Sequence, residues 1–279
     1  MNRKIAFMYD FDRTLCTKDM QNYGFIPGLG MSDSEFWSAV GVQTVEHQMD
    51  PILSYLYSMV TASKRRGLPL TRAYLNSLGQ GIELYPGVDT WFDRVNAYGN
   101  ERNIEIEHYV ISSGLEEIIE GSAIADKFKR IYASRFHYDE NGLADWPSVS
   151  INYTNKTQFL FRIHKGIMDV SDDRINEYMP DEEIAVPYPN LVYFGDGMTD
   201  VPCMSLVKRN GGTSLAVYAA NTEAPRKLME QNRVNFAVPA DYSKGSRLEK
   251  IIFRVIDKVA FSEDLKSMRE TEKEILHCK

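Results

Sequence analysis

Short apolar runs of strand length alternate with amphipathic helical segments along most of this chain. The first run, Ile5 to Tyr9, is apolar at every position and ends at Asp10, which is typical of a strand buried on both faces of a parallel sheet. Later apolar runs, each followed by a helical segment, lie at 108–111, 191–194, 214–218 and 235–238. This alternation predicts an α/β fold with a Rossmann-like, doubly wound parallel sheet.

The stretch between the first two runs has a different pattern, with helices and loops but no convincing strand. Ser32 to Glu35 has the form of a capping box, and apolar residues recur at helical spacing from Ile52 to Val60. A helical stretch between two strands of such a sheet is best explained as an insertion. We therefore expect a core formed by residues 1–16 and 86–279, and an inserted, mainly helical cap domain at 17–85.

A hairpin and a further helix are expected after the second run. Arg130 to Tyr138 and Ser148 to Tyr153 flank Glu140-Asn141-Gly142, a turn sequence of the kind that joins two antiparallel strands. Gly114 to Ile119 is predicted to begin a helix directly after the strand at 108–111.

The charge of the chain bears on its partners. The net charge is −7 for 279 residues, which disfavours nucleic acid or an anionic membrane surface as the main partner, because both require clustered Lys and Arg. No run of about 18 apolar residues is free of charge, so no membrane span is predicted. The first apolar run is interrupted by acidic residues before a signal-peptide core could form, so we expect no secretion.

The cysteines indicate the compartment. Cys16, Cys203 and Cys278 are odd in number and show no C-x-x-C spacing, which suits free thiols in a reducing cytoplasm better than a disulfide framework. We therefore expect a cytoplasmic protein.

Four polar motifs follow strands or precede helices of the predicted sheet. Ligands of open parallel sheets bind beyond the carboxyl ends of the strands, so residues at these positions are the candidates for chemistry. The motifs are DFDRTL at 10–15, SSG at 112–114, NKT at 155–157 and GDGMTD at 195–200.

Four of these residues are carboxylates that the fold would bring to one edge of the sheet. Asp10 and Asp12 end one strand, and Asp196 and Asp200 follow another. Together they would form a negative, all-oxygen pocket, which is what a hard cation such as Mg²⁺ requires. The cation would also relieve the repulsion between the carboxylates. We expect a magnesium site here.

In order and placement the four motifs resemble those of the haloacid dehalogenase superfamily, in the phosphoserine-phosphatase-like subgroup with a helical cap. The resemblance covers essentially the whole chain outside the insertion. It implies that Asp10 binds Mg²⁺ through a carboxylate oxygen and Asp12 through its backbone carbonyl, with Asp196 as a further ligand. Asp200 would bind directly or through water.

The resemblance also implies roles in catalysis. Asp10 would be the nucleophile and form an aspartyl-phosphate, which splits the reaction into two displacements. Asp12 would protonate the leaving oxygen and later deprotonate the attacking water. A carboxylic acid at position 12 favours phosphatase or phosphomutase chemistry over dehalogenation.

The other two motifs would bind the phosphate. Lys156 would supply a positive charge and Ser112 a hydroxyl donor, and the amides around Ser113 and Gly114 would contact the phosphate from a helix N-terminus. The S-x-G pattern favours Ser112 over Ser113 as the ligand. Lys165, nine residues after Lys156, is a competing candidate.

We therefore expect a Mg²⁺-dependent phosphomonoesterase that acts on a small phosphorylated metabolite. Two alternatives are a phosphotransferase or phosphomutase with the same intermediate, and a non-catalytic phosphate-binding regulatory module. The substrate stays open because the cap lacks the serial Arg and Ser residues associated with serine recognition, although Asp19 occupies the approximate place of an acidic substrate contact there. We expect the cap aromatics Trp37, Tyr55 and Tyr57 to pack rather than to form a substrate cage.

Overall fold

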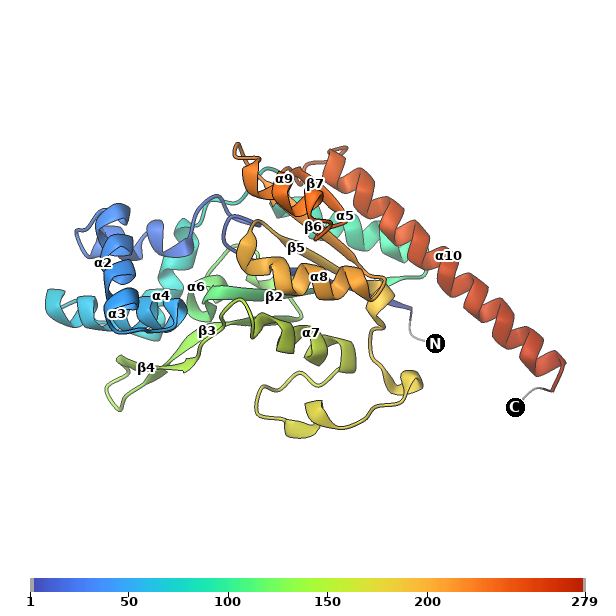
Figure 1. The fold of residues 1–279 in the computed structure, drawn as a ribbon, viewed down its shortest axis with the longest axis horizontal. Coiled ribbons are helices and arrows are strands. Elements are labelled where there is room, and N and C mark those ends of the chain that lie inside the picture. Colours follow the sequence, from blue (N-terminus) through green and yellow to red (C-terminus); the bar gives the residue numbers. More distant parts are fainter. Residues whose placement is uncertain (1–2, 278–279) are drawn as a thin grey trace.

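A computed structural model describes residues 3–277, so that Cys278, one of the three predicted free thiols, lies outside the described residues. A seven-stranded sheet runs through the molecule (Figure 1). Its strands follow the order β4-β3-β2-β1-β5-β6-β7, and all neighbours are parallel except β3 and β4. The predicted α/β fold is confirmed. The strands are β1 (Lys4–Tyr9), β2 (Glu105–Leu115), β3 (Arg130–Tyr138), β4 (Ala144–Val149), β5 (Leu191–Gly195), β6 (Thr213–Tyr218) and β7 (Phe236–Pro239).

The central strand β1 fixes the position of the sheet's carboxyl edge. Its last residue, Tyr9, is level with Val110 of β2 and with Phe194 of β5. Because parallel strands end at the same edge, the residues that follow Tyr9 and Phe194 are brought together there.

Helices cover both faces of the sheet, as the two-sided burial of β1 requires. Phe7 and Tyr9 belong to one apolar cluster, and Ala6 and Met8 belong to another on the opposite face. The first face is covered by α5 (Val88–Asn100) and α10 (Arg247–Ile275), and the second by α7 (Lys156–Lys165), α8 (Val201–Arg209) and α9 (Glu223–Glu230). Within residues 3–277, none of the helices combines the length and apolarity that a membrane span needs.

The stretch at 17–85 is helical in the structure too. Helices α2, α3 and α4 gather at one end of the molecule, and the C-terminal part of α10 extends at the other (Figure 1). The predicted capping box is present, since the Glu35 amide donates to Ser32 Oγ at 3.3 Å and the Ser32 amide donates to the Glu35 carboxylate at 2.8 Å. The helices of this stretch are α1 (Phe25–Gly28), α2 (Asp33–Glu46), α3 (Pro51–Arg66) and α4 (Arg72–Leu78).

The two ends of this helical stretch pair with each other. Cys16 and Leu84 form an isolated antiparallel bridge, and the Tyr85 amide donates to the Leu15 carbonyl at 3.0 Å. A second bridge joins Thr71 to Leu143 of the β3–β4 turn. The chain therefore enters and leaves the helical stretch at one place, and the stretch also touches the hairpin.

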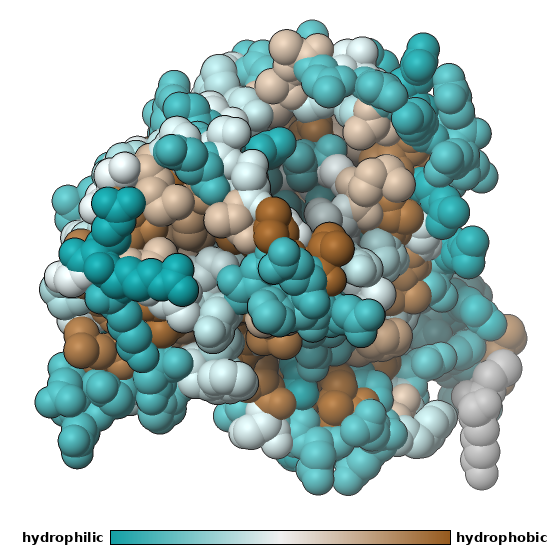
Figure 2. Space-filling model, turned by 60° about the vertical axis from the view of Figure 1, so that its left-hand side comes forward, coloured by the Kyte–Doolittle hydropathy of each residue, from teal (hydrophilic) through white to brown (hydrophobic). Residues whose placement is uncertain are grey.

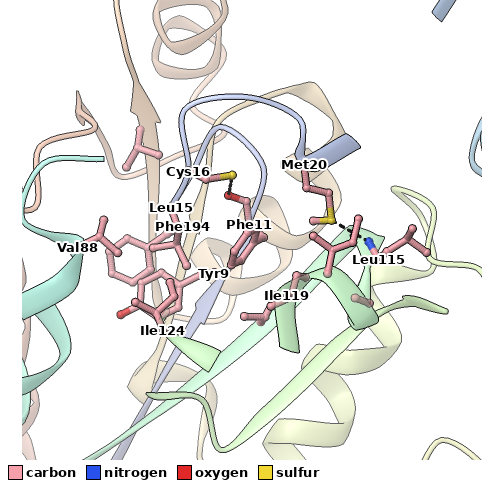
Figure 3. Close-up of a cluster of buried hydrophobic side chains, with 14 of the residues drawn as sticks. Tyr9, Phe11, Leu15, Cys16, Met20, Val88, Leu115, Ile119, Ile124 and Phe194 are labelled. Atoms are coloured by element: carbon pink, nitrogen blue, oxygen red, sulfur yellow. Dashed lines mark hydrogen bonds between the residues drawn. The ribbon is translucent and has the colours of Figure 1, made fainter. Parts of the chain in front are cut away.

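Apolar side chains connect the helical stretch with the sheet. Figure 3 shows Met20 pointing toward Leu115, whose amide donates to Met20 Sδ at 3.1 Å. The loop that carries Phe11 and Cys16 lies beside them, and Cys16 Sγ donates to the Phe11 carbonyl at 3.5 Å (Figure 3). These side chains belong to the same buried cluster as the first face of the sheet.

Two predicted boundaries are wrong. Strand β2 continues to Leu115, and the following helix, α6 (Glu116–Glu120), is short and does not begin at Gly114. The second strand of the hairpin spans Ala144–Val149 rather than 148–153. It contains Pro147, which has no backbone N–H to donate. An edge strand tolerates proline because one side of the strand has no neighbouring strand to hydrogen-bond with.

The remaining short elements are 3-10 helices. They lie at Met20–Asn22, Gly79–Gly81, Ala125–Lys127, Asp173–Asn176, Asp181–Glu183, Tyr188–Asn190 and Met198–Asp200.

Candidate active site

Three carboxylates meet where β1 and β5 end. Asp10 follows β1, while Asp196 and Asp200 follow β5, and oxygen atoms of all three lie within 4.8 Å of one another. The Asp10 amide donates to the Phe194 carbonyl at 2.8 Å, which fixes the two strand ends to each other. The three carboxylates could hold a metal ion between them.

A buried lysine completes this group. Lys156, the first residue of α7, is 1% exposed, and its Nζ lies 3.0 Å from Asp10 Oδ1 and 2.8 Å from Asp200 Oδ1. The competing candidate, Lys165, lies at the other end of α7 and donates to the carbonyls of Ile175 and Glu177. Of the two lysines, Lys156 is the one that the fold brings to the carboxylates.

Two residues to which the sequence analysis assigned no role, Tyr193 and Gly195, contact Asp200. The Tyr193 hydroxyl, buried inside β5, donates to Asp200 Oδ1 at 2.7 Å. Gly195 packs directly against the Asp200 carboxylate, so a side chain at position 195 would collide with it. A tyrosine within a fully buried strand was a usable signal, because a buried hydroxyl normally has a hydrogen-bond partner.

Burial and mutual repulsion raise the pKa values of the carboxyl groups. Burial raises the pKa of Asp10 to about 6, although the positive charge of Lys156 opposes the shift. Burial, and then the charges of Asp200 and Asp10, raise the pKa of Asp196 to about 8. Burial lowers the pKa of Lys156, but the two carboxylates outweigh this effect and the net shift is upward. The site therefore favours an additional positive charge.

Asp12 lies beside the three carboxylates but is held differently. Its Oδ1 accepts a hydrogen bond from the Met20 amide at 2.9 Å. Burial raises its pKa well above the usual range, and the charges of Asp10 and Asp19 add to the shift. This environment favours the protonated form of the Asp12 carboxyl group.

Ser112, Ser113 and Gly114 lie at the end of β2 and line a cavity next to the carboxylates. The Gly114 amide donates to Ser112 Oγ at 3.0 Å, and the Ser113 carbonyl accepts from the Tyr55 hydroxyl at 2.6 Å. The expectation that Ser113 and Gly114 lie at a helix N-terminus is wrong, because β2 is extended through both residues and α6 begins only at Glu116. Gly114 packs closely against Met20, so a Cβ at position 114 would force the end of the Met20 side chain to shift.

A cavity of about 630 Å³ opens above these groups. Its floor comes from the strand ends and its opposite wall from α2 and α3 of the helical stretch. The aromatic residues Trp37 and Tyr55, expected only to pack, both line it. The residues outside the helical stretch that line it are Asp10, Asp12, Arg13, Ser112, Ser113, Gly114, Tyr153, Lys156, Asp196, Gly197, Met198 and Thr199.

One ion pair lies at the rim of the cavity. The Arg13 guanidinium donates to the Asp19 carboxylate at 2.7 Å. Asp19, placed in the sequence analysis near a possible substrate contact, is therefore paired with a residue of its own chain.

We expect removal of the lysine charge to destabilise the fold. Lys156→Met leaves Asp10 and Asp200 buried without a cationic partner, so the free energy of unfolding in EDTA should fall by about 3–5 kcal/mol at pH 7. Lys165→Met, the matched control, should cost less than about 1.5 kcal/mol. Denaturant unfolding of both variants measures the difference, and equal losses would show that the buried ion pair is unimportant.

The raised pKa of Asp196 predicts a pH dependence of stability. Between about pH 4 and 8 the folded metal-free protein keeps a proton that the unfolded chain has lost, so stability should fall as pH rises through this range. In EDTA at pH 8, Asp196→Asn should therefore unfold roughly 2–4 °C above the original protein. The exposed Asp126→Asn should show no difference.

The same thermal scans with MgCl₂, MnCl₂ or CaCl₂ test the metal site. A bound cation stabilises the original protein more than the Asp196→Asn variant, because the variant lacks one of the three carboxylates. A melting temperature that is independent of both pH and cation would contradict the assignment of a metal site.

The chain matches known proteins along most of its length. The family model of haloacid dehalogenase-like hydrolases matches residues 7–205. An uncharacterized protein of Borreliella burgdorferi strain B31 is 28% identical over 280 residues, which covers 90% of this chain and 96% of that protein.

Three solved structures share the fold. A hydrolase of the haloacid dehalogenase family from Salmonella enterica serovar Typhi is 20% identical, with a TM-score of 0.57 over 85% of this chain and 67% of its own. A substrate-bound phosphoserine phosphatase is 13% identical, with a TM-score of 0.56 over 90% and 98%. A probable phosphoserine phosphatase from Vibrio cholerae is 14% identical, with a TM-score of 0.57 over 95% and 67%. The family match confirms the resemblance seen in the four motifs, and the chain belongs to the haloacid dehalogenase-like hydrolases.

Proposed function

We propose that this hydrolase is a Mg²⁺-dependent phosphomonoesterase in which Asp10 receives the phosphoryl group before water removes it. The observation that carries the proposal is the buried group formed by Lys156 and the three neighbouring carboxylates in a member of this family. Phosphoryl transfer requires mainly positioning and charge stabilisation, which such a group supplies.

The donor set fits Mg²⁺. Asp10, Asp196 and Asp200 offer carboxylate oxygens, the ligands that this hard cation prefers, and we assign the backbone carbonyl of Asp12 as a fourth. When bound, Mg²⁺ would neutralise negative charge on the phosphate oxygens. Asp200 is already held by Lys156 and Tyr193, so its contact with the cation could be through water.

The phosphate would be bound by Lys156 and the end of β2. Lys156 Nζ is held between two carboxylates, so its positive charge has a fixed position. The Ser112 hydroxyl oxygen accepts a hydrogen bond from the Gly114 amide, so the hydroxyl proton is available for a phosphate oxygen. Ser113 Oγ is buried, and among residues 3–277 it has no hydrogen-bond partner. We therefore retain both serines and Gly114 as phosphate-binding residues.

Asp10 and Asp12 would divide the chemistry between them. Asp10 would attack phosphorus as a carboxylate. Lys156 stabilises this charged form, and a bound Mg²⁺ would supply further positive charge. Burial and the neighbouring carboxylates raise the pKa of Asp12, which favours its protonated form. It can protonate the departing alkoxide and then take a proton from the water that attacks the aspartyl-phosphate.

Residues 17–85 would act as a cap over the site. Support comes from the paired ends of this stretch at Cys16 and Leu84, and from the cavity wall that α2 and α3 provide. A wall on this side limits the access of water to the phosphoryl group. The similarity in fold to phosphoserine phosphatases favours hydrolysis of a small phosphorylated molecule.

Replacing the nucleophile tests the proposal directly. Asp10→Asn should lower kcat for p-nitrophenyl phosphate by roughly 10³-fold or more, because the amide cannot form the covalent intermediate. EDTA should abolish the activity of the original protein, and excess Mg²⁺ should restore it. Hydrolysis retained by Asp10→Asn would reject Asp10 as the nucleophile, and a phosphorylated acceptor alcohol among the products would indicate transfer.

The role of Asp12 predicts a dependence on the leaving group. Asp12→Asn should lower kcat by roughly 10²- to 10⁴-fold for alkyl phosphates, whose alkoxides need a proton to depart. The loss should be smaller for p-nitrophenyl phosphate when formation of the intermediate limits the rate, since p-nitrophenolate departs without a proton. Presteady-state release of the alcohol measures this step, and equal losses with both leaving groups would contradict the role of Asp12 as the acid.

A further inference from the structure

The wall of the cavity opposite the carboxylates is apolar. It is formed by the side chains of one face of α2 and the first turns of α3. These residues are Trp37, Val40, Val45, Pro51, Ile52 and Tyr55. Thr44 of α2 and Gln21 of the 3-10 helix Met20–Asn22 also line the cavity, and both are neutral.

Apolar side chains that would usually be buried are exposed at the cavity mouth. Val45 is 79% exposed, Met198 59% and Tyr153 44%, and they come from three separate segments of the chain. On the face that Figure 2 brings forward, polar side chains cover most of the periphery and apolar ones gather nearer the middle. Apolar side chains that converge around a cavity are typical of a binding site for an apolar group.

The charged side chains that line the cavity all have another partner or role. Asp10, Asp12 and Asp196 are the carboxylates at the floor of the cavity, and Lys156 pairs with Asp10 there. The remaining two, Arg13 and Asp19, pair with each other at 2.7 Å. Arg13 and Asp19 already neutralise each other at the rim, so neither is left unpaired to attract an ammonium or a carboxylate group of the substrate.

We propose that the substrate is a phosphomonoester of an uncharged, apolar alcohol rather than of an amino acid or a polyol. This inference rests on the proposed phosphatase function and concerns the organic group alone. The cavity volume of about 630 Å³ lies within the range of small-molecule sites. The organic group would lie against α2 and α3 while its phosphate lies at the floor.

A series of alkyl phosphates tests the inference, because the reacting group stays the same while the length of the apolar chain changes. Ethyl, butyl and hexyl phosphate release alkoxides of similar basicity, so differences in kcat/KM report contact with the apolar wall. Each buried methylene contributes up to about a fourfold gain, and we expect hexyl phosphate to exceed ethyl phosphate by at least about tenfold. O-phosphoserine should not exceed ethyl phosphate.

Matched variants locate the effect. Val45→Asn and Ile52→Asn alter the wall, whereas Val42→Asn and Leu53→Asn alter partly exposed positions on the same helices that do not line the cavity. The first pair should reduce the preference for hexyl over ethyl phosphate by roughly threefold or more each, and the second pair should leave it unchanged. Turnover of ethyl phosphate by the Val42→Asn and Leu53→Asn variants reports that the controls keep an intact site, and the ratio of hexyl to ethyl phosphate turnover within each wall variant corrects for any change in its basal activity.

The outcomes separate the two proposals. Mg²⁺-dependent hydrolysis with no dependence on chain length, or with O-phosphoserine as the best substrate, would overturn the apolar substrate and leave the phosphatase standing. An equal loss of preference in both pairs of variants would also overturn it. Failure to hydrolyse any of these esters or p-nitrophenyl phosphate would overturn the proposed function together with the inference.

Discussion

Three carboxylates lie within 4.8 Å of one another at the carboxyl edge of the sheet, and their mutual repulsion has to be balanced for the chain to fold. Lys156 contributes one positive charge, held between Asp10 and Asp200. Burial, the largest cause, keeps the pKa values of Asp10 and Asp196 raised in spite of this positive charge, and the repulsion of Asp200 adds to the shift of both. A site in this condition is poised to bind a cation, and the same excess of negative charge that costs stability provides affinity.

Much of the fold could be predicted because local patterns and tertiary structure agree. The uniform apolarity of Ile5 to Tyr9 predicts a central strand with two covered faces, and the alternation of strands and helices predicts the parallel sheet. The end of β2 could not be predicted from local pattern. Ser112 to Gly114 would suit a turn or a helix start, but the pairing of Leu115 with Ser134 of β3 continues the strand beyond this irregular segment.

The site residues could be predicted where a charged residue lies at the end of a predicted element. Asp10 and Asp196 follow strands and Lys156 begins a helix, and the structure brings these three side chains together at one edge of the sheet. Tyr193 and Tyr55 were not predicted, because their hydroxyls find partners through packing rather than through any motif. The paired state of Asp19 likewise depends on a turn at Arg13 that has a left-handed backbone conformation, with φ of 55°.

The shared apolar cluster has a consequence for how the molecule unfolds. Phe36 and Leu56 of the helical stretch, and Phe7 and Trp91 of the sheet and its covering helix, belong to one continuous buried cluster. Separation of the stretch from the sheet would therefore expose apolar surface on both sides of the contact. Heat or denaturant should thus disrupt the two parts in a single cooperative step, so that damage to either one lowers the stability of the whole chain.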